Sequence, residues 1–140
     1  MALKASTLKV GDTHVERVVD NLSRTQIVQY AGASGDYNPL HTDEVYTTQV
    51  AGYRSVFAHG MLTMGLTGKV LTNYVGAGRL NRFGVRFTNQ VWPGDTLDAT
   101  ATVAAIREED GKLFADLTVS TVNQDGKEVM SGTATARIDP

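Results

Sequence analysis

Residues 60–75 read GMLTMGLTGKVLTNYV, and this stretch decides the expected fold. Its apolar side chains are spread around much of a helical circumference, and no charge interrupts them before Lys69. A surface helix has one apolar stripe and one polar face, so we expect a helix that is buried on most of its sides. At a rise of about 1.5 Å per residue it is roughly 25 Å long, which is enough to cross a small domain.

Strand-like patterns follow this helix from about residue 80. Apolar residues alternate with polar ones in residues 85–87, 97–103 and 113–119, and a period of two is typical of strands with one buried face. Turn-type sequences separate the runs: Pro93-Gly94-Asp95, Asp110-Gly111 and Gln124-Asp125-Gly126-Lys127. Because such joints favour hairpins, the sequence predicts an antiparallel meander of strands.

The chain before residue 80 is expected to form helices and loops. Ser23 and Gln26 form a capping-box pair ahead of an apolar-periodic stretch, which predicts a helix from about Arg24. A second short helix is expected at 43–49, with its N-cap at its first residue or the one before. Residues 35–39, Gly-Asp-Tyr-Asn-Pro, favour a turn, so a loop should join the two helices.

These elements belong to the α+β class, because an antiparallel sheet must bury one face and here a single long helix is available to cover it. A sheet wrapped around a mostly buried helix is the hotdog arrangement. The 140 residues contain no repeat, low-complexity block or linker. We therefore expect one domain over residues 1–140.

Composition excludes several classes of function. A formal net charge of −2 gives no reason to expect nucleic acid or an anionic membrane as a partner. The chain has no cysteine, which excludes disulfides, thiolate chemistry and cysteine-based metal sites. The first twelve residues lack the apolar stretch of a signal peptide, and no apolar run is long enough to span a bilayer, so a cytoplasmic location is expected.

One segment carries a family motif. Residues 30–41, YAGASGDYNPLH, resemble the signature loop of the MaoC-like (R)-specific enoyl-CoA hydratases, also called hydratase 2. The resemblance continues through residues 57–61, 85–87 and 93–97, with Gln90 where the family usually has proline. Residues 10–12 and 58–65 are also similar to the HadB-type catalytic subunit of the mycobacterial (3R)-hydroxyacyl dehydratases.

The resemblance implies a hotdog enzyme of fatty-acid metabolism that needs no cofactor. Such enzymes interconvert trans-2-enoyl and (R)-3-hydroxyacyl thioesters carried on coenzyme A or acyl carrier protein. It also implies that Asp36 and His41 are catalytic, and that the backbone N–H of Gly60 forms the oxyanion hole.

The chemistry of hydration supports the same residues. Water must be activated against C3, C2 must be protonated, and the negative charge on the thioester oxygen needs donors. Asp36 and His41 lie five residues apart across a proline-stiffened loop, and imidazole can exchange protons near neutral pH. Asn38 does not titrate and is expected to support the loop or the water. Gly60 begins the long helix, where an unpaired N–H suits a developing anion.

Each histidine and the aspartate also has a plainer interpretation. Taken alone, Asp36 would form an Asx-turn, and His41 would cap a helix or face solvent. We expect His59 to hold the Gly60 turn by a backbone hydrogen bond, outside the catalytic pair. His14 is expected at the surface.

Metal binding is not expected, because a third ligand beside Asp36 and His41 is missing and no HxxxH or HxH spacing occurs. The arginines at positions 79, 82 and 86 could grip the phosphates of the carrier, and we assign Arg86 to substrate binding, although a solvated face is the alternative. Met61 and Met64 are expected in the core or along an acyl tunnel.

Assembly follows from the exposed edge of such a sheet. Two hotdog subunits should pair edge to edge, as a homodimer or as a heterodimer with a second hotdog subunit. Two other functions stay open: a hotdog thioesterase, and an acyl-thioester-binding subunit without activity. The presence of both Asp36 and His41 argues against the inactive subunit.

Overall fold

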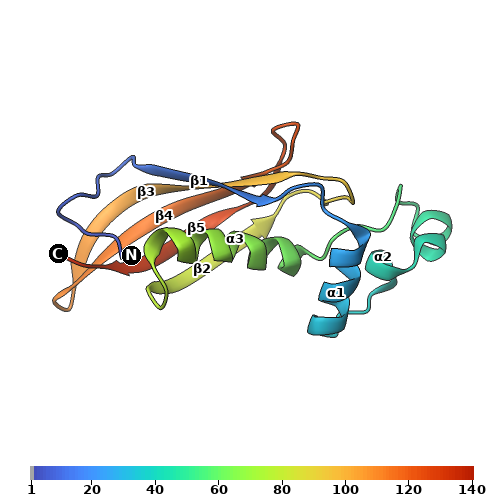
Figure 1. Cartoon of the computed structure of the whole chain (residues 1–140), viewed down its shortest axis with the longest axis horizontal. Helices are drawn as coiled ribbons and strands as arrows, with labels where there is room; N and C mark the ends of the chain where they lie inside the picture. The colour runs from blue at the N-terminus through green and yellow to red at the C-terminus, as the bar shows by residue number, and fades with distance from the viewer. Residues whose placement is uncertain (1) are drawn as a thin grey trace.

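The computed structural model describes residues 2–140 (Figure 1). Five antiparallel strands form one sheet in the order β1-β3-β4-β5-β2. The elements are β1 (Thr13–Val19), α1 (Arg24–Ser34), α2 (Pro39–Thr42), the π-helix η1 (Tyr46–Val50), α3 (Gly60–Val75), β2 (Leu80–Phe87), β3 (Leu97–Glu109), β4 (Lys112–Val122) and β5 (Glu128–Ile138). None of the helices in these residues is long and apolar enough to cross a membrane.

Helix α3 lies along one face of the sheet, as the hotdog arrangement requires (Figure 1). Leu71 and Val75 of this helix are fully buried against the inner face of β3, β4 and β5. Burial of these apolar surfaces is the main force that holds the two layers together. The predicted helix bounds and the predicted α+β hotdog class are confirmed.

A narrow stripe of α3 stays exposed on the side away from the sheet. It contains Met61, Gly65, Lys69 and Asn73, which are spaced at one helical turn. Met61 is 55% exposed, so the expectation that it lies in the core is wrong, whereas Met64 packs against the core. The helix therefore offers an uncovered apolar side chain beside its first residue.

The predicted hairpins are half right. β3 and β4 are joined by Asp110 and Gly111, both with positive φ, as in a two-residue hairpin turn, and β4 pairs with β5. β2, however, pairs with β5, so 93–95 is not a hairpin turn. Backbone hydrogen bonds instead tie this turn to Leu22, from Gly94 N to Leu22 O and from Leu22 N to Asp95 O, which places β3 beside β1.

The sequence does not predict strand β1, because polar side chains on its inner face remove the usual alternation of apolar and polar residues. His14 and Glu16 lie opposite the buried Ala101 and Ala99 on the helix side of the sheet, while Val15 points outward and is 62% exposed. His14 is half-buried and stacks on a tyrosine of α3, so it is not a plain surface histidine.

The helical extension before α3 projects beyond the end of the sheet (Figure 1). The Ser23 capping box and the start of α1 are as predicted. The second predicted helix, 43–49, is present within one residue of its expected bounds, because residues 44–50 are helical and the last five wind as the π-helix η1. The short helix α2 before it was not predicted. Asp43 still acts as a cap, since its side chain accepts the N–H of Tyr46 at 3.0 Å.

Candidate active site

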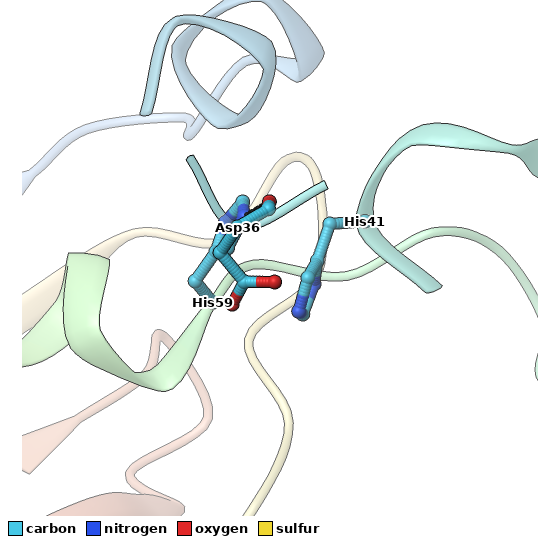
Figure 2. Close-up of side chains that lie close together, drawn as sticks. All are labelled: Asp36, His41 and His59. Atoms are coloured by element: carbon cyan, nitrogen blue, oxygen red, sulfur yellow. Dashed lines mark hydrogen bonds between the residues drawn. The ribbon is translucent and has the colours of Figure 1, made fainter. Parts of the chain in front are cut away.

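Three segments bring Asp36, His41 and His59 together where the helical extension meets α3. Asp36 comes from the loop after α1, His41 from α2, and His59 immediately precedes α3. One nitrogen or carboxylate oxygen from each side chain lies within 4.8 Å of the other two (Figure 2). The predicted meeting of Asp36 and His41 in space is confirmed, and a third titratable group joins them.

Two overlapping Asx bonds shape the loop that carries Asp36. Gly35 ends α1 in the left-handed conformation that favours glycine. Asp36 Oδ1 then accepts the N–H of Asn38 at 3.2 Å, and Asn38 Oδ1 accepts the N–H of Leu40 at 3.0 Å. Asp36 is therefore a turn residue through one carboxylate oxygen, and its other oxygen has no hydrogen-bond partner in the described part of the chain, which leaves it available for chemistry. Asn38 supports the loop by capping α2.

The ring of His41 is fixed in a single tautomer. Its Nδ1 lies 2.6 Å from the carbonyl oxygen of Phe57, and a carbonyl can only accept, so Nδ1 carries the proton. In the neutral ring Nε2 then bears the lone pair. Burial lowers the pKa of His41 from its ordinary 6.5, with a smaller lowering by His59, against raising effects of the Phe57 hydrogen bond and Asp36. Nε2 is therefore a free proton acceptor near neutral pH.

His59 is the member of this cluster that sequence reasoning placed outside the catalytic pair. It is only 2% exposed, and its Nε2–H donates to the backbone oxygen of Asp36 at 2.9 Å. Its ring stacks on His41 with centroids 3.9 Å apart and planes 25° from parallel. The predicted backbone hydrogen bond exists, but it fixes the Asp36 loop, 23 residues away, rather than the Gly60 turn. Its place in the motif next to Gly60 was the available signal.

The argument against a metal site needs correction. The third ligand that the count lacked is present, because His59 joins Asp36 and His41. However, the two rings are stacked, and the lone pairs of stacked rings run side by side instead of converging on one ion. One nitrogen of each ring is also bonded to a backbone oxygen. The arrangement does not favour a metal, and its absence stays a prediction.

A pocket of about 290 Å³ opens beside Gly60 at the start of α3. It is lined mainly by the segments on either side of it: Phe57, Ala58, Gly60, Thr63, Phe87–Val91 and Val129. The N–H of Gly60 has no intrahelical acceptor at this position, and the helix dipole adds positive charge there. A Cβ at Gly60 would lie 3.1 Å from the ring of Phe87, so a larger residue would crowd this wall.

Residues 6–124 match the family described as "MaoC like domain". The chain belongs to the MaoC-like family. The (R)-specific enoyl-CoA hydratase of Rhodospirillum rubrum is 36% identical over 119 residues, which cover 84% of this MaoC-like chain and 80% of that protein. The 3-hydroxyacyl-thioester dehydratase Y of Mycobacterium tuberculosis is 36% identical over 89 residues, 61% of this chain.

The fold agrees with that of a solved MaoC-like relative. The (R)-hydratase from A. caviae involved in PHA biosynthesis has a TM-score of 0.83 and 28% identity, over 96% of this chain and 99% of that one. The resemblance to the hydratases and to the mycobacterial dehydratases is thus confirmed. The aligned segment spans only 31% of dehydratase Y, so that protein's activity as a whole is not transferred.

Arg86 lies away from this MaoC-like site. It is opposite Ser131 on the outer face of β2, whereas its neighbour Phe87 lies on the inner face and lines the pocket. Arg79 is occupied by an ion pair with Asp139 at 2.6 Å. The structure therefore brings together Asp36, His41 and the segment leading to Gly60, but not Arg86.

Proposed function

We propose that this MaoC-like protein interconverts trans-2-enoyl and (R)-3-hydroxyacyl thioesters in fatty-acid metabolism, with the acyl group on coenzyme A or acyl carrier protein. The observation that carries the proposal is the free Nε2 of His41, which lies beside the Asp36 carboxylate. The bond from His41 Nδ1 to the Phe57 carbonyl also ties this ring to the segment that leads to Gly60. The named hydratase and dehydratase relatives supply the reaction class.

In the hydration direction, a water hydrogen-bonded to Asp36 loses a proton to Nε2 of His41 as its oxygen attacks C3. The imidazolium then returns a proton to C2, so the elements of water are added and no cofactor is consumed. The N–H of Gly60 stabilises the enolate oxygen that forms between the two steps. Dehydration is the reverse sequence through the same groups.

An absorbance assay with crotonyl-CoA, in the presence of a thiol-reactive dye, tests this function. We expect loss of the enoyl absorbance without thiol release, and an (R)-3-hydroxy product. Thiol release would assign the protein to the hotdog thioesterases instead. An (S) product, or unchanged absorbance in every assembly state of the protein, would contradict the proposal.

We propose that carrier phosphates are bound by Arg54 rather than by the predicted Arg86. The Arg54 guanidinium lies 4.3 Å above the ring of Trp92 and lines a polar hollow. That hollow shares Asn89 and Gln90 with the pocket beside the oxyanion donor. Arginine suits phosphate because its donors form a fork.

Substitution of either arginine distinguishes the two sites. Arg54→Gln should raise KM for crotonyl-CoA and leave KM unchanged for the crotonyl thioester of N-acetylcysteamine, which has no phosphate. Arg86→Gln is the matched control and should change neither value. The opposite pattern would restore Arg86 as the carrier contact.

We also propose that two subunits pair through the edge strand β2, either as a homodimer or with a second hotdog chain. Among residues 2–140, β2 pairs only with β5, so its other edge is free. Phe87 at its end is 50% exposed, and Met61 on the neighbouring helix is 55% exposed. Pairing there would cover both side chains and close the pocket that Phe87 lines.

A further inference from the structure

We propose that His59 is a positioning residue, which holds the Asp36 backbone and the His41 ring in their working arrangement without exchanging protons itself. This inference rests on the proposed function and adds a residue to it. His59 lies between the two candidate catalytic groups, bonded to one and stacked on the other.

The first contact restrains Asp36. The Asp36 loop is exposed and otherwise held by short-range bonds to its own neighbours. The hydrogen bond from His59 Nε2 is a long-range connection that ties this loop to the start of α3. Because a neutral imidazole carries one proton, a donor at Nε2 leaves a lone pair at Nδ1.

The other ring nitrogen of His59, Nδ1, supports a role for this residue beyond packing. His59 Nδ1 is buried and has no hydrogen-bond partner among residues 2–140. A buried polar atom without a partner is unfavourable for stability, so an apolar ring would serve better if packing were the only role. The histidine makes sense where both a ring face and an in-plane donor are needed.

The second contact restrains His41. The Phe57 carbonyl fixes one atom of the His41 ring, and stacking on His59 fixes the plane of that ring, which together define the direction of the Nε2 lone pair. The His59 ring also covers one face of His41 against water. The other titratable groups that face the pair are Asp36 and Tyr30, whose ring makes an edge contact with His59 at 4.8 Å.

Two substitutions separate the two contacts. His59→Phe keeps the ring face and loses the donor, whereas His59→Gln keeps an amide donor and loses the ring. His14→Gln is the control, because His14 also stacks on an aromatic ring, but it is only half-buried and lies on β1 at the far end of α3.

The expected results differ between the variants. In His59→Phe, kcat should fall roughly 10- to 100-fold with little change in KM, because the Asp36 loop is no longer tied down. In His59→Gln, water reaches His41, so the pKa of His41 should rise and the acidic limb of the pH–rate profile should move to higher pH. His14→Gln should match the wild type in both properties.

A titration of the histidine ring signals by NMR completes the test, since it needs no substrate. The pKa of His41 should rise more in His59→Gln than in His59→Phe, because the phenyl ring still covers His41 against water and keeps the larger effect of burial. If both variants keep the wild-type kcat per folded molecule and the wild-type titration of His41, the inference is overturned. If the wild type lacks hydratase activity while the titration behaves as expected, the proposed function fails and the positioning contact stands.

Discussion

Asp36 combines a turn contact and a catalytic candidate in one side chain. An asparagine at this position can still accept the Asn38 N–H through its own Oδ1. Asp36 is exposed, so replacing its charge relieves no large desolvation cost. Asp36→Asn should therefore leave Tm nearly unchanged, because surface substitutions typically alter the free energy of unfolding by no more than roughly 0.5 kcal/mol. Thermal unfolding measures this, and a large drop in Tm with activity retained would make Asp36 only a turn residue.

The pH dependence of the reaction depends on the ring of His41. The neutral form is the proton acceptor, so the rate should fall as the pH drops through the pKa of this residue. Because burial lowers that pKa, the midpoint of the acidic limb should lie below 6.5. A kcat/KM profile with crotonyl-CoA measures the midpoint. A midpoint at or above 6.5 would show that His41 is not the buried base.

Sequence alone could predict that Asp36 and His41 lie together, because a short motif keeps them close along the chain, and that Gly60 begins α3. His59 is 18 positions beyond His41, so its stacking depends on how α3 docks against the extension. Local patterns carry no information on that docking. The same limit explains Arg86, whose side of β2 depends on the pairing of that strand with β5.

Two glycines of helix α3, Gly60 and Gly65, form a matched pair for substitution by alanine. A methyl group at Gly60 would lie 3.1 Å from the Phe87 ring, whereas one at Gly65 would meet nothing within 4 Å. Gly65→Ala should therefore stabilise the protein by about 0.5–1 kcal/mol through helix propensity.

Gly60→Ala should lower the free energy of unfolding by about 1–3 kcal/mol, because the added methyl group crowds the Phe87 ring. It should also lower turnover. Urea denaturation of the two variants measures the difference. Equal stabilisation by both alanines would show that Gly60 is not in contact with the pocket wall.

The elements that the sequence predicts well are those with one clear apolar period. Helix α3 and the β3–β4 hairpin have such a pattern and appear where expected. β1 places histidine and glutamate on its inner face, and 46–50 form a π-helix, whose irregular winding has no simple sequence signature. Tertiary contacts, not local preference, fix these two segments.

The class of fold follows from one buried helix and a set of alternating strands. The order of the strands does not, because the turn at 93–95 docks on Leu22 and carries the chain across the sheet. This crossing leaves β2 at an edge, with Phe87 at its end lining the pocket beside Gly60. The edge proposed for subunit pairing and the pocket therefore share Phe87.

Subunit assembly is the prediction that follows from this edge. The purified chain should form a dimer in solution, measured as molar mass by light scattering, and activity should accompany the dimer. A chain that is inactive alone and is rescued by a second hotdog subunit would indicate the heterodimer. A stable, fully active monomer would contradict pairing through β2.

The rates of crotonyl-CoA hydration by Asp36→Asn, by His41→Gln and by the double variant test the central claim most directly. Two groups that act on one water fail as a unit, so each single change should lower kcat by roughly 10²–10⁴-fold, and the double variant should be little slower than the slower single variant. Near-wild-type turnover in either single variant, or losses that multiply in the double variant, would contradict the assignment of Asp36 and His41 as one catalytic pair.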